Sequence, residues 1–179
     1  MMPYYTKVSD SLFVASSDIV ALGQNDFDLV KSASVSSDKK RSRINAHRSD
    51  QDLLHEMFLC IQGSSYIRPH KHNFKSESYF VIDGKCDVII FKDCGEIDDV
   101  IRLDSSKKYF SVYCRISKCC FHTLVVRSDF LVMHEVTNGP FDKSDTLYAS
   151  FAPSEDDVES VPLFKEKLIN AIDQFVLGK

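Results

Sequence analysis

The stretch YIRPHKHNFKSESYFVIDG, residues 66–84, places two histidines and a glutamate within eight positions, just before a turn. Residues two apart in a strand point to the same side, so His70 and His72 are expected to project together. Glu77 follows after a gap of four residues and is expected to return on the neighbouring strand to the same place. Burying three ionisable groups costs several kcal/mol unless a cation or hydrogen-bond partners offset it. The pattern therefore predicts part of a ligand set for a divalent metal, with a purely structural network as the alternative.

The segments around this stretch predict a β-rich domain. Asp83-Gly84 separates two apolar runs and predicts a β-hairpin, and Cys94-Gly95 marks a second turn. Three further short runs are rich in β-branched and aromatic residues: YFSVYCRI (109–116), FHTLVVRS (121–128) and DFLVMHEV (129–136). Many short strands with closely spaced turns indicate a sandwich or a small barrel.

Both ends of the chain have helical patterns. Ser16 and Ser17 are expected to cap a helix with apolar residues between Ile19 and Val30, and residues 32–43 are expected to form a loop. A second helix is predicted within VPLFKEKLINAIDQFVLGK (161–179), whose apolar face holds Leu168, Ile172, Phe175 and Val176. These patterns divide the chain into a helical or extended N-terminal segment (1–40), a barrel (41–153) and a C-terminal helix (154–179) that packs on the barrel or on a partner.

Composition excludes several classes of function. The formal net charge of -4 and the single short basic cluster around residues 39–43 argue against nucleic-acid binding. The sequence has no run of about 18 apolar residues, the length that a membrane span requires, and its first residues lack the apolar block of a signal peptide. A cytoplasmic location is therefore expected, with the six cysteines as reduced thiols.

The spacing of the histidine stretch resembles a known motif. Gly63-x6-His70-x-His72-x4-Glu77-x6-Gly84 resembles the first motif of the cupins, with one additional residue between the first glycine and the first histidine. The resemblance implies a mainly β fold, the cupin double-stranded β-helix or jelly-roll barrel, with flanking N- and C-terminal helices. It also implies a third histidine from a second motif. His122 is the candidate, although the proline and glycine that usually precede that histidine are missing here.

A narrower resemblance covers residues 15–155. Six segments occur in the same order as in WbuC-type cupin metalloproteins, which are encoded in bacterial O-antigen and other surface-polysaccharide gene clusters: RSRINAH (41–47), YIRPHKH (66–72), KSESYFVIDGK (75–85), the FHT around His122, HEVTNGPF (134–141) and ASFAPSE (149–155). What this resemblance implies is a metal-binding cupin of sugar metabolism. The ligands would be His70, His72, Glu77 and His122, with one divalent transition metal (Fe, Mn, Ni, Co or Zn) in a centre that leaves positions open for water or substrate.

Other polar residues are candidates for binding a substrate. Arg43, Asn45 and His47 alternate along RSRINAH and point the same way if that segment is extended. With Arg68 and Lys75 they are expected to bind a phosphate, diphosphate or carboxylate. The alternative for Arg43 and Lys75 is a solvated side chain.

Three residues are candidates for moving a proton, namely His47, Tyr79 and Glu135. Tyr79 shares the parity of Glu77, and a half-buried barrel tyrosine is the equal alternative. Glu135 shares its parity with Leu131 and Met133, and an apolar surrounding raises the pKa of a carboxyl group. His55 and His134 are expected to be ordinary histidines.

Three functions are consistent with these residues. The first is an enzyme that isomerises, epimerises or tautomerises a sugar or sugar nucleotide. The second is an Fe(II)-dependent oxygenase with the same ligands. The third is a non-catalytic, metal-stabilised module that binds a sugar or assists assembly. The expected partner protein is a second copy of the chain, as a homodimer.

Overall fold

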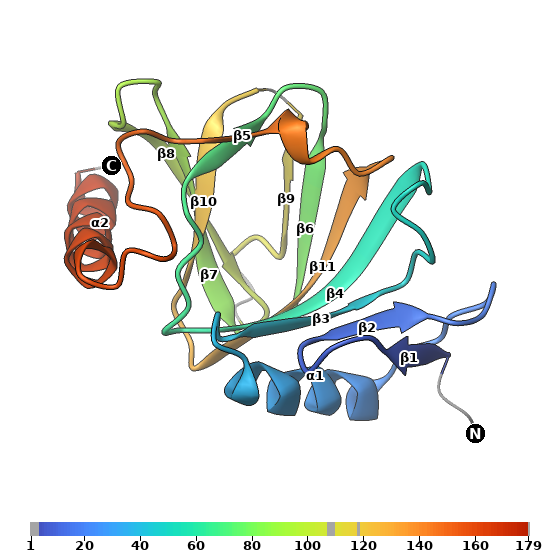
Figure 1. The fold of residues 1–179 in the computed structure, drawn as a ribbon. Coiled ribbons are helices and arrows are strands. Elements are labelled where there is room, and N and C mark those ends of the chain that lie inside the picture. The colour runs from blue at the N-terminus through green and yellow to red at the C-terminus, as the bar shows by residue number, and fades with distance from the viewer. Residues whose placement is uncertain (1–3, 107–109, 118, 179) are drawn as a thin grey trace.

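In a computed structural model, the protein is a barrel of two facing sheets with one helix near each end of the chain (Figure 1). The structure describes residues 4–106, 110–117 and 119–178. The seven-stranded sheet has the order β1 (Tyr5–Lys7), β2 (Leu12–Ala15), β3 (Arg41–Asn45), β4 (Leu54–Gln62), β11 (Phe130–Asn138), β6 (Glu77–Asp83) and β9 (Tyr113–Ile116). The five-stranded sheet has the order β12 (Thr146–Tyr148), β5 (His70–His72), β10 (Phe121–Val126), β7 (Lys85–Phe91) and β8 (Ile97–Asp104).

The strands alternate between the inside and the outside of the barrel. On β11, Leu131 and Met133 belong to the interior core, whereas Val132 packs outside against α1 (Gln24–Ser36). All described strand pairs in the sheets are antiparallel except β2 with β3. The prediction of a mainly β jelly-roll barrel with flanking helices is confirmed.

The predicted hairpin at Asp83-Gly84 is wrong. β6 pairs with β11 and β9, whereas β7 pairs with β10 and β8, so this turn carries the chain from one sheet to the other. Gly84 has a φ of 91°, which glycine adopts without the strain of a side chain. A turn dipeptide specifies backbone direction only, so it does not reveal which strand the next segment will pair with. The second turn is a true hairpin, because β7 and β8 pair and Lys92 N donates to Glu96 O at 2.9 Å.

The predicted start of the first helix is also wrong. The helix α1 begins at Gln24, where the Asp26 carboxylate accepts from the backbone N–H of Gly23 at 2.7 Å. The Ser17 hydroxyl instead accepts from Ile19 N in a local turn. The loop predicted for residues 32–43 is shorter, since α1 continues to Ser36 and β3 begins at Arg41. Burial of the α1 side chains against the outer face of the seven-stranded sheet, with Val30 fully buried, overrides the weak helical propensity of this serine-rich segment.

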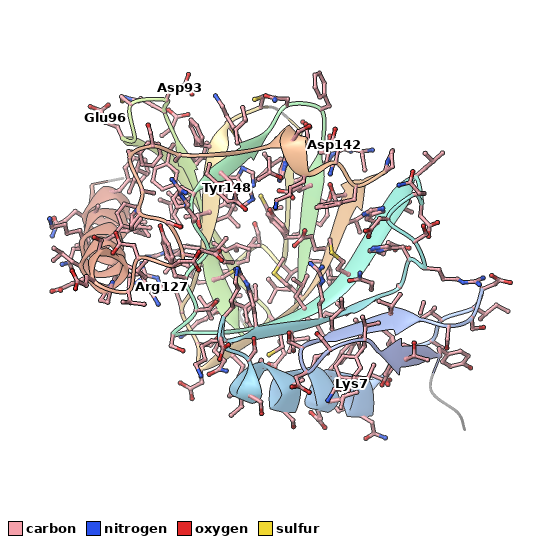
Figure 2. The ribbon with its side chains drawn as sticks, in the orientation of Figure 1. Lys7, Asp93, Glu96, Arg127, Asp142 and Tyr148 are labelled. Carbon is pink, nitrogen blue, oxygen red and sulfur yellow. The ribbon has the colours of Figure 1, made fainter. Side chains whose placement is uncertain are left out.

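The C-terminal helix, α2 (Ser160–Leu177), packs on its own barrel. Leu168 and Ile172 are buried against Ile89 and Phe91 on the outer face of the five-stranded sheet. Arg127, labelled in Figure 2, donates to Asp87 at 2.7 Å and to Asp173 at 2.8 Å, which ties the helix to the sheet. Neither helix in the described part of the chain has the length and apolarity that crossing a bilayer requires.

Candidate metal centre

Four side chains converge inside the barrel. His70 and His72 lie on β5, and His122 lies on β10 directly opposite His70 in the ladder. Glu77 is the first residue of β6, which belongs to the other sheet. Glu77 therefore returns to the same place as the histidines, as expected, but not on a strand that pairs with β5. It reaches the histidines across the interior. One donor atom from each of the four residues lies within 4.8 Å of the others.

The Glu77 carboxylate holds the cluster together. Its Oε2 lies 2.9 Å from His122 Nε2 and its Oε1 lies 3.2 Å from His72 Nε2. The Tyr79 hydroxyl donates to the same Oε2 at 2.7 Å. Tyr79 therefore fixes the carboxylate in place, and its proton is engaged by Glu77.

The Nδ1 atoms of the histidines have partners away from the centre. His70 Nδ1 lies 2.9 Å from the Arg68 carbonyl, and His122 Nδ1 lies 3.0 Å from the Cys120 carbonyl. His72 Nδ1 lies 3.3 Å from Thr146 Oγ1. A carbonyl oxygen only accepts, so Nδ1 of His70 and of His122 carries a proton and Nε2 is the atom left to face a metal, as in metal-binding histidines generally.

The residues present fit a divalent transition metal. Three imidazoles and a carboxylate are ligands of Zn(II), Fe(II), Mn(II), Co(II) and Ni(II). Donors about 2.1 Å from a shared ion lie at most about 4.2 Å apart, so the observed limit of 4.8 Å requires only small side-chain movements. The cluster is therefore a candidate metal centre.

The pKa values of three residues in the cluster are strongly shifted. Burial opposes ionisation of Glu77, but the hydrogen bonds with His122 and His72 hold its pKa well below the usual range. Burial alone would lower the pKa of His122, yet its bonds to Cys120 and Glu77 raise it to about 10. Burial, together with the neighbouring His122, lowers the pKa of His70 to about 4. Before a cation binds, a carboxylate and an imidazolium occupy the centre as a pair.

The cluster opens into a cavity of about 940 Å³. All residues predicted for the site line it: Arg43, Asn45, His47, Arg68, His70, His72, Lys75, Glu77, Tyr79, His122 and Glu135. Arg43 and Asn45 lie on β3 with the inward parity that the sequence predicts. One row of side chains crosses the seven-stranded sheet, because neighbouring strands pair Asn45 with Met57, Met57 with Glu135, and Glu135 with Tyr79.

The predicted cations have different partners. Arg68 Nη2 donates to the Ala149 carbonyl at 2.9 Å, and its guanidinium carbon lies 5.2 Å from the centre of the Tyr148 ring. Lys75 Nζ lies 5.2 Å from the centre of the Phe141 ring. The exposed Arg43 side chain makes no hydrogen bond or ion pair within the described residues. All three remain available to an anion in the cavity.

Glu135 and His47 have shifted pKa values. Burial and the nearby charge of Glu77 raise the pKa of Glu135 to about 8, against the opposing effect of Arg43. Burial lowers the pKa of His47, whose Nδ1 lies 3.1 Å from the Glu56 carbonyl. At neutral pH the Glu135 carboxyl therefore carries a proton in the metal-free protein.

Several cavity residues were missed by the sequence analysis. His55, expected to be an ordinary histidine, is buried in the cavity wall and stacks on His47 with ring centres 4.1 Å apart. Thr137 lies between His55 and Glu77 in the register, and the parity of Glu135 two positions earlier could have identified it. Tyr148, labelled in Figure 2, also lines the cavity. No sequence motif marks Tyr148, and its position in the cavity depends on the short strand β12 that carries it. His134 lies outside the cavity and stacks on Phe58.

Part of the chain matches a known protein family in sequence. Residues 22–103 match the family described as Domain of unknown function (DUF6016). The matched region contains three residues of the cluster and ends before His122. No curated protein matches the chain in sequence.

Solved structures with a similar fold include three bacterial proteins. A protein from Shewanella oneidensis shares 13% identity over 58% of this chain and 70% of its own, with a TM-score of 0.49. The capsular polysaccharide assembling protein CapF from Staphylococcus aureus shares 18% identity over 63% of this chain and 32% of its own, with a TM-score of 0.49. An oxalate decarboxylase mutant from Bacillus subtilis shares 14% identity over 54% of this chain and 24% of its own, with a TM-score of 0.44. This chain thus spans a third or less of the length of the last two, and likenesses of this size do not extend to function.

Proposed function

We propose that this chain is a metal-dependent cupin enzyme that isomerises, epimerises or tautomerises a sugar or sugar nucleotide in bacterial surface-polysaccharide assembly. The observation that carries the proposal is the His70, His72, Glu77 and His122 cluster in the wall of a large cavity. Structural zinc sites are enclosed by their protein ligands, whereas catalytic sites keep a position open to substrate. A cluster that faces about 940 Å³ of open volume supports the catalytic alternative.

The bound metal would polarise a carbonyl group or bind vicinal hydroxyls of the substrate. The chain itself supplies the charge that an anionic substrate needs. Arg43, Arg68 and Lys75 line the same cavity as the cluster, and guanidinium groups bind phosphate and carboxylate oxygens in a bidentate manner. A sugar phosphate or a nucleoside diphosphate sugar fits this distribution of charge.

Neutral polar groups in the cavity support a hydroxylated substrate. Asn45 Oδ1 and Thr137 Oγ1 are buried and have no hydrogen-bond partner within the described residues. A buried polar group without a partner costs about 1–3 kcal/mol, and a ligand that supplies the partner removes that cost. The hydroxyl groups of a sugar would supply it, and the resemblance to WbuC-type proteins suggests the same class of ligand.

Proton transfer is assigned to Glu135. This carboxyl group lines the cavity in register with Tyr79, and burial raises its pKa from 4.5 toward neutral pH, to about 8 in the metal-free protein, which suits a group that donates and accepts a proton. Tyr79 orients Glu77 through its hydroxyl. His47, stacked on His55, is the second candidate base.

The proposal is tested by following solvent hydrogen into the substrate. Protein loaded with Zn²⁺, Mn²⁺ or Fe²⁺ is incubated in D2O with a panel of hexose phosphates and sugar nucleotides. The products are then separated, and their masses are measured by mass spectrometry. Isomerisation, epimerisation or tautomerisation by proton transfer adds one deuteron at the reacting carbon, and chelator-treated protein should show none. Ligand binding without conversion would indicate the non-catalytic module, and oxygen consumption would indicate the oxygenase.

We also propose that the chain is a homodimer, as cupins commonly pair through their sheets. Since α2 covers its own barrel, the interface would lie on another face. Light scattering of the purified protein tests this assembly, and a monomer at micromolar concentration would contradict it.

A further inference from the structure

Asp145 lies beside a metal-site histidine without being one of the four clustered residues. It ends the short helix η1 (Lys143–Asp145), directly before β12. The next residue, Thr146, is paired with His72 in the β12–β5 ladder. The Asp145 residue is only 5% exposed. A nearly buried carboxylate next to an imidazole requires a physical reason, because burial of an unpaired charge is costly.

The two oxygens of Asp145 have different surroundings. Oδ1 accepts from the backbone N–H groups of Asn73 and Phe74, at 3.1 and 3.0 Å. These bonds fix the loop that follows His72. Oδ2 is buried and has no hydrogen-bond partner within the described residues. It lies 3.6 Å from His72 Nδ1.

His72 differs from the other two histidines of the cluster. His70 and His122 each direct Nδ1 at the carbonyl of the residue two positions earlier, Arg68 or Cys120. The Nδ1 atom of His72 faces Thr146 Oγ1 at 3.3 Å and Asp145 Oδ2 at 3.6 Å. Next to Nδ1 of His72, side-chain oxygens therefore occupy the position that a backbone carbonyl oxygen occupies in His70 and His122.

We propose that Asp145 is a positioning residue of the metal centre, whose Oδ2 accepts from His72 Nδ1–H and so directs His72 Nε2 at the ion. A movement of a few tenths of an ångström brings the two atoms to hydrogen-bond distance. A carboxylate behind a metal-bound imidazole fixes its tautomer and raises its basicity. Its negative charge also offsets part of the charge of a divalent ion. The inference rests on the metal centre of the proposed function.

The substitution Asp145→Asn separates the two tasks of this side chain. An asparagine retains an oxygen that can accept from the Asn73 and Phe74 amides, whereas its NH2 group cannot accept from His72 Nδ1–H. We expect the affinity for Zn²⁺ and Co²⁺ to fall about ten- to hundredfold, with little change in the melting temperature of the metal-free chain. Asp145→Ala removes both tasks and should lower the metal affinity and that melting temperature.

Asp142→Asn is the matched control. Asp142, labelled in Figure 2, caps the same short helix by accepting from Ser144 N at 2.8 Å. It is exposed and makes no hydrogen bond to a histidine within the described residues. Its substitution should leave the metal affinity unchanged.

Three results would overturn the inference. The first is wild-type metal affinity in the Asp145→Asn chain. The second is an equal loss of metal-free stability in Asp145→Asn and Asp145→Ala, which would make the role purely structural. If Asp145→Asn does not fold, nitrogen NMR of the Zn²⁺-loaded wild-type chain decides: a proton on His72 Nδ1 supports the inference, and a bare or metal-bound Nδ1 is the third contrary result. Absence of metal binding by the wild-type chain would instead contradict the proposed function.

Discussion

Glu77 and His122 come from strands of different sheets, and their side chains meet inside the barrel with Glu77 Oε2 2.9 Å from His122 Nε2. The pair joins the two sheets at the candidate metal centre. It also determines the charge of the metal-free protein, because the carboxylate stabilises the imidazolium form of His122. A metal that binds His122 Nε2 must displace that proton.

Metal binding is therefore expected to release protons. The folded pKa of His122 is about 10 and its ordinary value is 6.5, so His122 is charged at pH 7 and about one proton per ion should leave. The metal affinity should increase as the pH rises toward 10. The stabilisation that this pair gives the metal-free fold is fully present between the ordinary pKa values of Glu77, 4.5, and His122, 6.5. It is lost as the pH rises through about 10, and also as the pH falls through the lowered pKa of Glu77. Calorimetric titration at pH 7 in two buffers of different ionisation enthalpy measures the release, and a value of zero would contradict the assignment of His122 as a ligand.

His72→Ala should lower the metal content of the purified protein strongly. His72 supplies one of the four donor atoms and lies 3.2 Å from Glu77 Oε1, so its loss leaves three ligands and a vacant side of the centre. We expect at least a tenfold loss of affinity, measured by elemental analysis after dialysis.

His134→Ala is the control for this substitution. His134 stacks on Phe58 on the outside of the barrel, with ring centres 4.4 Å apart, and lies outside the cavity. Its removal should leave the metal content unchanged. Equal occupancy in His72→Ala and wild type would show that the ligand assignment is wrong.

The local patterns of the sequence predicted the inner face of the barrel well. Alternation along residues 41–47 and 131–137 is a property of any extended strand, so the inward side chains of Arg43, Asn45 and Glu135 could be predicted without knowing their neighbours. The His70 and His72 pair could be predicted for the same reason. The resemblance to cupins supplied the closed barrel and His122.

Relationships between strands could not be predicted in this way. The Asp83-Gly84 turn fixes the backbone direction at one position, but hydrogen bonds with β11 and β10 decide which sheet each strand joins. Glu77 therefore reaches the histidines from the opposite sheet. Asp145 approaches His72 because β12 pairs with β5, a contact between residues 73 positions apart in sequence. Such a contact leaves no periodic pattern in the sequence.

Tyr79→Phe should destabilise the metal-free protein. Tyr79 is 3% exposed, and its hydroxyl donates to Glu77 Oε2 at 2.7 Å. Removal of a hydrogen bond to a buried charged group costs about 1.5–3 kcal/mol in the free energy of unfolding. Tyr113→Phe is the control, because Tyr113 is 50% exposed and its hydroxyl lies 3.3 Å from the Ser78 hydroxyl; we expect about 0.5 kcal/mol or less there. Urea denaturation of chelator-treated protein compares the two, and equal effects would contradict a structural role for the Tyr79–Glu77 bond.

Glu135→Gln should abolish most of the conversion of substrate while leaving the metal in place. The glutamine is nearly isosteric and remains inside the cavity, but it cannot exchange a proton, so the rate should fall about 10²- to 10⁴-fold. The metal content should stay at the wild-type level, because Glu135 is not among the clustered donors. Rate and metal content are measured on the same preparation.

The pH profile gives an independent test of this role. As an acid, Glu135 is active while protonated, so the rate should fall as the pH rises through its pKa. That pKa is about 8 without metal, raised by burial and by Glu77 from an ordinary value of 4.5. A cation bound at Glu77 offsets the effect of the Glu77 charge, so in the metal-loaded enzyme the rate should fall at a pH between these two values. This fall in rate should be absent in Glu135→Gln and retained in Glu56→Gln, whose side chain is 43% exposed and lies 3.4 Å from His134. A fall in rate that persists in Glu135→Gln would assign the proton transfer to another residue, for which His47 is the next candidate.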